Sequence, residues 1–265
     1  MCFGVAAGEL HWNSTDLNGT VWASPLVVKA GDGTELAVLG SENGSVYAID
    51  TANGALRWRL QTGGPVFSSA VSVDPSNPSA NAIYVGSWDG YLYKLSRGEG
   101  KVLGKLQFET EIRATPALHA SSTRAGDSSA AAVDEEALFF SLGVSHVCVA
   151  SDTTGRLSVR WRVNTTAFAY GSPSLSNDGR LVLFPPSGDR MAYARHVATG
   201  EAVWAHEIGA GRSDVSTQGA VSADGTTFYF VGRSNGGNGQ LALYGYGVTS
   251  GVSRYTSEWP AEQGR

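Results

Sequence analysis

The sequence predicts an all-β fold, a β-propeller of four-stranded antiparallel blades, and three observations carry this prediction. The 265-residue chain has 34 glycines and only 16% charged residues, against about 25% in an average soluble domain, so it is rich in turns and poor in exposed helices. Its sequence repeats at steps of 45, 46, 57 and 46 residues. Each repeat holds short alternating apolar segments separated by tight turns, the pattern of strands joined to their sequence neighbours.

Each repeat begins with a small or polar residue, then proline or another small residue, then an apolar alternation. The copies of this first phrase start at Ser24, Ser69, Thr115, Ser172 and Gln218. A fixed period of about 40–50 residues is typical of propellers and other repeat architectures. We therefore expect five modules of about four strands each.

The middle of each module is a predicted hairpin. Its best copies cover residues 36–50 and 83–95, where Asn43-Gly44 and Asp89-Gly90 separate two alternating runs. Asn-Gly and Asp-Gly favour a type I′ turn, which needs a positive φ at both central residues. Gly44 and Gly90 are therefore predicted to be turn glycines.

Each module ends with a glycine followed, four residues later, by an aromatic residue. This spacing places turn glycines at Gly54, Gly200 and Gly251 and aromatics at Trp12, Trp58, Trp204 and Tyr255. The gap widens to six residues before Trp161, and the aromatic is absent at Gly104. We expect Trp12, Trp58, Trp161, Trp204 and Tyr255 to be structural, wedged between neighbouring blades, since a large flat side chain there buries about 150–250 Å².

The modules account for residues 1–265 as one domain, preceded by one extra outer strand that ends at Trp12. The step of 57 residues holds an insertion of about residues 119–136, which is rich in Ser and Ala. Such a segment has little to pack against a core, so we expect a flexible surface loop.

Residues 40–58 followed by 62–69 resemble the tryptophan-docking repeat of PQQ-like propellers. That family includes quinoprotein alcohol dehydrogenases, BamB-type outer-membrane assembly lipoproteins and the C-terminal propeller of some acyl-activating enzymes. The competing WD40 fold is disfavoured because Trp88-Asp89 lies inside a predicted hairpin turn. The resemblance implies a ring of about eight blades, so five modules and one strand predict a partial or unusually small propeller.

Composition limits the partners. The 19 Lys and Arg residues are outnumbered by 24 Asp and Glu residues, with no basic block, so nucleic acid is not an expected partner. Apolar runs are strand-sized, as in residues 137–140, so no transmembrane span is expected. No signal peptide is visible at the N-terminus. That predicts a cytoplasmic protein as written, or an extracytoplasmic one if the N-terminus is truncated.

No catalytic or metal-binding residues can be assigned, and cofactor-binding residues stay unknown. The resemblance to dehydrogenases implies PQQ held with calcium beside an adjacent pair of cysteines, but Cys2 and Cys148 lie far apart. The five histidines lack zinc-site spacing. We therefore expect no cofactor and a non-catalytic interaction scaffold within a larger protein or assembly, which needs a protein partner or the missing blades. The alternatives are a relative of a PQQ-dependent dehydrogenase and the propeller of an acyl-activating enzyme.

Overall fold

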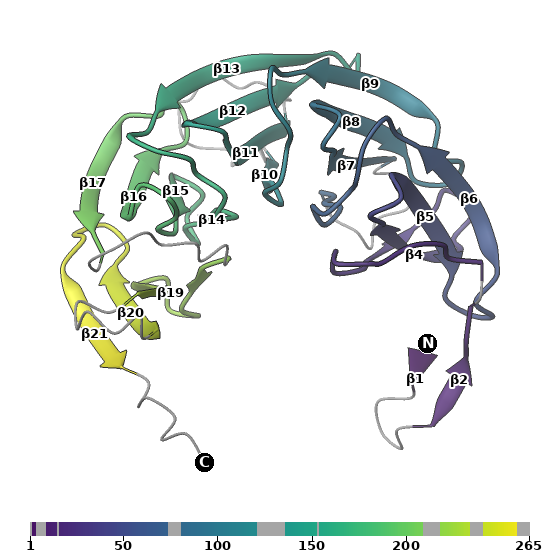
Figure 1. Ribbon diagram of the computed structural model, residues 1–265, viewed down its shortest axis with the longest axis horizontal. Helices are drawn as coiled ribbons and strands as arrows, with labels where there is room; N and C mark the ends of the chain where they lie inside the picture. Colours follow the sequence, from purple (N-terminus) through teal and green to yellow (C-terminus); the bar gives the residue numbers. More distant parts are fainter. Residues whose placement is uncertain are drawn as a thin grey trace. The chain divides into compact units, whose positions relative to one another are not determined.

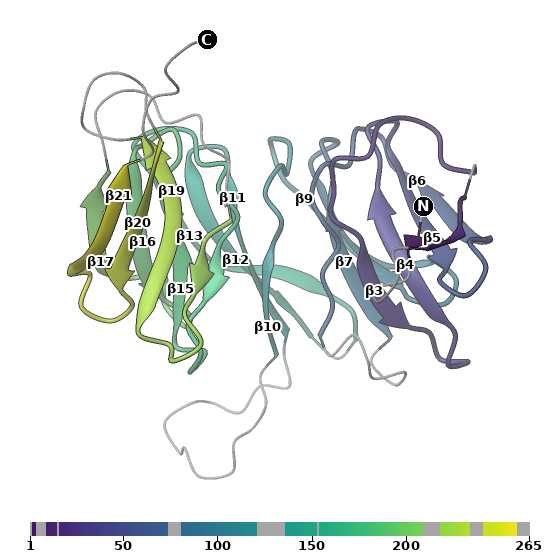
Figure 2. The same cartoon turned by 90° about the horizontal axis from the view of Figure 1, so that it is seen from below.

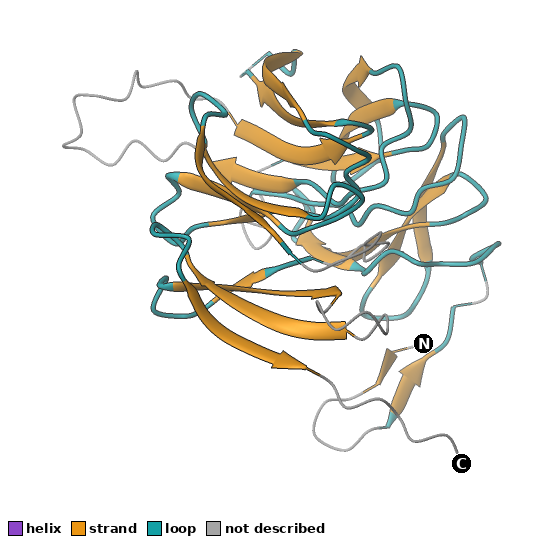
Figure 3. Cartoon of the chain, turned by 60° about the vertical axis from the view of Figure 1, so that its left-hand side comes forward, coloured by secondary structure: helices purple, strands orange, loops and turns teal. Residues whose placement is uncertain are grey.

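The computed structural model describes residues 2–3, 9–14, 16–73, 81–120, 136–152, 154–208, 218–233 and 241–258. These residues contain strands and turns and no helix (Figure 3), so the all-β prediction is confirmed. The chain forms two compact units. Unit 1 comprises residues 1–115 and 151–157, and unit 2 comprises residues 116–150 and 158–265. Each unit is described by itself.

Unit 1 contains three antiparallel sheets whose strands follow chain order (Figure 1). Its strands are β1 (Cys2–Phe3) and β2 (Leu10–Trp12) in the first sheet, β3 (Leu26–Lys29), β4 (Glu35–Gly40), β5 (Ser45–Asp50) and β6 (Leu56–Gln61) in the second, and β7 (Ala82–Gly86), β8 (Tyr91–Ser96) and β9 (Val102–Gln107) in the third. Val71 forms an isolated bridge with Tyr84 of β7, in the place of a fourth strand.

Unit 2 contains three four-stranded sheets of the same order (Figure 2). Its strands are β10 (Ala117–Ala120), β11 (Glu136–Leu142), β12 (Ser145–Ser151) and β13 (Leu157–Asn164); β14 (Ser174–Leu175), β15 (Leu181–Phe184), β16 (Met191–His196) and β17 (Ala202–Glu207); and β18 (Ala220–Val221), β19 (Thr227–Arg233), β20 (Leu241–Gly247) and β21 (Ser253–Glu258). Ser151 and Leu157 belong to unit 1 by their contacts.

Two expectations change in detail. The predicted insertion is narrower than residues 119–136, because His119 and Ala120 pair with β11 and Glu136 begins that strand. Residues 121–135 lie outside the described part of the chain. The extra N-terminal strand is not alone either, since β1 pairs with β2 and sets Cys2 opposite Trp12.

In the second sheet of unit 1, the third strand is buried on both faces, whereas the fourth is largely exposed. Five of the six residues of β5 are buried, but β6 buries only Trp58. A strand covered on both faces reads as a continuous apolar run, and an outer strand alternates. In unit 1, residues from β3–β6 and β7–β8 share one core that includes Val38, Ala48, Ile83 and Leu95. Burial of neighbouring sheet faces against each other therefore explains the low charge of the sequence.

Candidate interaction surface

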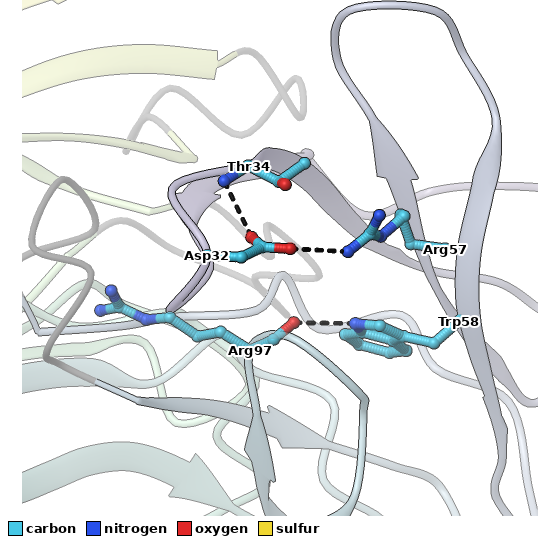
Figure 4. A network of polar contacts seen from close by, with 5 residues as sticks. All are labelled: Asp32, Thr34, Arg57, Trp58 and Arg97. Carbon is cyan, nitrogen blue, oxygen red and sulfur yellow. Dashed lines mark hydrogen bonds and ion pairs between the residues drawn. The ribbon is translucent and has the colours of Figure 1, made fainter.

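Four outer-strand tryptophans contact the sheet that follows them in the chain. The indole Nε1 of each one donates a hydrogen bond to a backbone carbonyl three residues before a glycine. The four bonds run from Trp12 to Thr51 (2.7 Å), Trp58 to Arg97 (2.8 Å, Figure 4), Trp161 to Val197 (2.9 Å) and Trp204 to Val248 (2.8 Å). The tryptophans therefore join successive sheets in each unit.

The glycine in each of these contacts must lack a side chain. An added Cβ at Gly54, where φ is +78°, would lie 2.6 Å from Cε3 of Trp12. Gly100 takes the same place against Trp58, with φ of +64°. Gly200 and Gly251 receive Trp161 and Trp204 in the same way. The sequence repeat gives no hint of this pairing, because each glycine receives the tryptophan of the previous module.

The third outer strand of unit 1, β9, has no aromatic residue at the docking position. Gly104 lies there instead, opposite Lys94 of β8, and an added Cβ would clash with the carbonyl oxygen of Gly155. In unit 2, Tyr255 lies in β21 opposite Gly245, and its side chain falls outside the described ones. The docking role of Tyr255 stays a prediction.

Gly44 and Gly90 lie in the turns between second and third strands, both with φ of +82°. The backbone N–H of Thr62 bonds to Gly44 and that of Phe108 to Gly90. In unit 2 the same bond runs from Ile208 to Arg190, which has φ of +59°. Arginine in this left-handed region is strained. Because Arg190 stands where Gly44 and Gly90 stand in unit 1, the sequence carries no Asn-Gly or Asp-Gly turn signal there.

The loops that enter each sheet run between these turns. In unit 1 the N–H of Val66 bonds to Ser41 (3.0 Å) and the N–H of Trp88 to Pro65 (2.9 Å), so the loop before β7 contacts the turns on both sides. The N–H of Ser69 then donates to Oγ1 of Thr115 (2.9 Å). These bonds place the loops and turns of unit 1 together at one end of its sheets.

We call Trp22, Glu42, Phe67, Trp88 and Arg113 the rim of unit 1. Phe67 and Trp88 pack with ring centroids 4.5 Å apart, and the Arg113 guanidinium lies 4.4 Å from the Trp88 ring centroid. Trp22 is 70% exposed. The rim therefore combines aromatic faces with charged groups at the surface.

Arg113 is held in place by Glu111, whose Oε1 accepts a 2.7 Å bond from the guanidinium. Hydrogen bonds from its own backbone N–H, from Arg113 and from Thr110 keep the pKa of Glu111 below its usual value. The carboxylate is therefore ionised at neutral pH and fixes the cation over Trp88.

Unit 2 also exposes apolar side chains at the loop that enters a sheet. Phe168 is 53% exposed and stacks in parallel with Tyr170 at 5.8 Å, and Val144 in the adjoining turn is 44% exposed. The N–H of Ala169 bonds to Gly143 at 2.7 Å, the counterpart of the bond from Val66 to Ser41. The exposed aromatics Trp22 and Phe168 thus come from the same kind of loop.

The described residues do not fit a quinone and calcium site. Cys148 is fully buried in β12, so it cannot form one half of an exposed vicinal disulfide. In the described ranges, no three His, Cys, Asp or Glu side chains converge as metal ligands. These residues therefore give no support to a reaction through PQQ, and the expected lack of a cofactor stays a prediction.

The repeated sheets and docked tryptophans define the class of protein as a PQQ-like repeat β-propeller. The sequence matches the family described as outer membrane protein assembly factor BamB over residues 1–103 and 88–254, and the chain belongs to this family. The structure of BamB from Moraxella catarrhalis superposes with a TM-score of 0.58 at 16% identity, over 90% of this chain and 65% of that one. The predicted fold class is therefore confirmed.

A second similarity is local. Over 87 residues the chain is 30% identical to the beta-alanine-activating enzyme of Drosophila melanogaster, a match over 33% of this chain and 8% of that protein. The chain thus spans a small part of that enzyme and about two thirds of the Moraxella protein. Among the described residues, no helix is long and apolar enough to cross a membrane.

Proposed function

We propose that this chain is a non-catalytic interaction scaffold that belongs to a larger protein or assembly. The observation that carries the proposal is the exposure of Trp22 and Phe168 on loops of the same kind in the two units. Large exposed apolar patches on soluble proteins, especially those rimmed by polar residues, mark interaction sites. Aromatic and Arg side chains are also the residues enriched at the energetic centres of protein interfaces.

The register of β1 supports an assembly role. Cys2 lies opposite Trp12 as Ala48 lies opposite Trp58, and a register shift follows at the next residue in both pairs. Strands β1 and β2 thus take the third and fourth positions of a blade. Among the described residues of unit 1, no strand pairs with the other edge of β1. An unpaired edge is a template for strand addition.

The test compares partners of two tagged proteins expressed in cells of the source organism. The wild-type chain is expected to retain specific proteins that are depleted several-fold from the double variant Trp22→Ala and Phe168→Ala. Leu56→Ala, which trims a 38% exposed side chain on β6, is the control and should retain them. Identical partner sets for wild type and the double variant would contradict the scaffold function.

The dehydrogenase alternative makes a separate prediction. A relative of a PQQ-dependent enzyme would bind PQQ with calcium stoichiometrically, whereas a scaffold gives no saturable heat in calorimetry. Saturable micromolar binding would overturn the non-catalytic proposal.

The acyl-activating alternative is favoured by the local similarity to the beta-alanine-activating enzyme. An antibody raised against this chain should then detect, in the source cells, a protein several times larger than 27.7 kDa. A native product near 27.7 kDa would exclude that alternative.

A further inference from the structure

The rim of unit 1 contains a cation that rests on an indole ring. Arg113 lies over Trp88, and Glu111 pairs with the guanidinium. Phe67 packs on Trp88 as well, at a ring-centroid distance of 4.5 Å and an interplanar angle of 58°. Aromatic faces attract cations through their quadrupole, and a neighbouring carboxylate strengthens the hold on the guanidinium. Unit 1 therefore supplies both parts of one cation site from its own chain.

The same backbone arrangement occurs one module earlier. The N–H of Glu42 bonds to Thr20 at 2.9 Å, as the N–H of Trp88 bonds to Pro65. Trp22 follows Thr20 by two residues, and Phe67 follows Pro65 by two residues. The position of Trp22 relative to Glu42 therefore corresponds to the position of Phe67 relative to Trp88.

A second pair of bonds relates Phe67 to Arg113. The N–H of Val66 bonds to Ser41 at 3.0 Å, and that of Ile112 bonds to Ser87 at 3.1 Å. Phe67 therefore takes, beside Glu42, the place that Arg113 takes beside Trp88. The order along the rim is Trp22, Glu42, Phe67, Trp88 and Arg113, so the backbone of Glu42 lies between two segments that each carry an aromatic residue.

This earlier position differs from the later one in what fills it. Trp22 is 70% exposed and Glu42 is exposed. The ion pairs recorded for the described residues include none for Glu42. Besides Glu42, the loops and turns of the rim carry two more acidic residues, Glu109 and Glu111, and one basic residue, Arg113. Negative charge therefore exceeds positive charge here, which complements a basic partner.

We propose that Trp22, Glu42 and Phe67 bind the guanidinium of an arginine in an extended segment of a protein partner. The guanidinium stacks on the Trp22 indole while the Glu42 carboxylate accepts its hydrogen bonds, as Arg113 does with Trp88 and Glu111. Arginine fits better than lysine because its planar group can stack and bond at the same time. The inference rests on the scaffold function and names the chemistry of the partner.

The test uses nitrogen-15-labelled protein and three synthetic peptides, acetyl-Gly-Arg-Gly-amide, acetyl-Gly-Lys-Gly-amide and acetyl-Gly-Gln-Gly-amide. The arginine peptide is expected to shift the indole N–H signal of Trp22 saturably, more tightly than the lysine peptide, while the glutamine peptide leaves the signal unchanged. Affinity should fall several-fold at about 0.5 M salt, since exposed charge interactions are screened.

Three variants complete the test. Glu42→Gln is expected to weaken arginine binding about tenfold or more, and Trp22→Ala to abolish the shifts of neighbouring amides. Glu99→Gln is the matched control, because Glu99 is an exposed acid paired with Lys101 in the turn after β8, and it should bind as wild type does. Unchanged amide spectra elsewhere verify that each variant is folded.

Equal shifts with the arginine and glutamine peptides, or full binding by Glu42→Gln, would overturn the arginine site. That failure differs from failure of the scaffold function. The scaffold function is still supported if the double variant Trp22→Ala and Phe168→Ala retains fewer partner proteins than the wild-type chain. It is contradicted if the two retain the same proteins.

Discussion

Two outer strands of unit 1, β6 and β9, make contrasting contacts with the residues of unit 1 that face them. In the Trp58 seam, the indole of Trp58 packs on Gly100 and bonds to the carbonyl of Arg97. In the Gly104 seam, the backbones of Gly104 and Gly155 meet directly. Both positions hold the same register, because Trp58 lies opposite Ala48 and Gly104 lies opposite Lys94.

The size of the opposed residue accounts for the contrast. Opposite Trp58 the neighbouring strand carries Ala48, and opposite Gly104 the neighbouring strand carries buried Lys94. Nζ of Lys94 and Oη of Tyr84 both donate to Oγ of Ser151, each at 2.8 Å. Close packing demands that the space be filled. In each seam the two opposed residues together, and not the tryptophan alone, therefore fill the space between the packed segments.

Removing the indole should have the largest effect. Trp58→Ala is expected to lower the free energy of unfolding by about 3–5 kcal/mol, the usual range for a buried tryptophan cut to alanine. Chemical denaturation measures the loss. Leu56→Ala on the same strand, at an exposed position, should change stability by less than about 0.5 kcal/mol. Similar losses in both variants would show that Trp58 does not hold the seam.

Filling the receiving glycine comes next. Gly100→Ala is expected to cost about 2–3 kcal/mol, because a positive φ strains alanine and the added Cβ meets the Trp58 ring. Gly33→Ala is the matched control, since Gly33 has φ of +81° and nothing within 4 Å of an added Cβ. Its cost should be only the backbone strain, about 1 kcal/mol. If Gly100→Ala and Gly33→Ala lowered the free energy of unfolding equally, the contact of Gly100 with Trp58 would not contribute to stability.

The Gly104 seam should depend on Lys94. Lys94→Ala is expected to destabilise the protein by about 2 kcal/mol, since it empties buried space and removes the bond to Ser151. Lys29→Ala, at an exposed position of β3, should have little effect in the same denaturation experiment. If Lys94→Ala were as mild as Lys29→Ala, the direct contact of Gly104 with Gly155 would suffice for the seam.

Measuring stability as a function of pH tests a polar contact in unit 2, which contrasts with the two seams of unit 1. Buried His146 stacks on Phe184, and Nε of Arg195 donates to its Nδ1 at 3.1 Å. Burial first, and the Arg195 charge second, hold the pKa of His146 well below its usual value. Arg195 also faces Tyr193, which bonds to Asp189. The folded protein therefore keeps His146 neutral.

The sign follows from proton binding. Below pH 6.5, His146 binds a proton in the unfolded chain but stays neutral in the folded protein. The free energy of unfolding is therefore highest above this pH and decreases below it, by up to about 1.4 kcal/mol for each pH unit. Denaturation midpoints between pH 7.5 and 5 measure the slope. His146→Phe should flatten it, while Trp58→Ala should leave the slope as in the wild type. A slope unchanged in His146→Phe would assign the pH dependence to other groups.

The sequence predicts much of this structure because the spacing of the repeated residues indicates where the strands and turns lie. The repeat places Trp12, Trp58, Trp161 and Trp204 on outer strands, and Asn-Gly and Asp-Gly mark two of the turns. Strand register was not readable, so the match between Lys94 and Gly104 could not be foreseen. The rim was hidden for a similar reason. Trp22 and Glu42 lie twenty residues apart, and the bonds from Glu42 and Ser41 to Thr20 bring their segments together.

The unusual gap between Gly155 and Trp161 has a consequence for how such chains change over time. Trp161 still reaches Val197 although it lies six residues after Gly155, where the other modules have a step of four, because its receiving glycine, Gly200, belongs to the next module. Insertions inside a module are therefore tolerated as long as the outer strand keeps its register. Deleting a whole module is different, since it removes one tryptophan and, at the same time, the glycine that receives another.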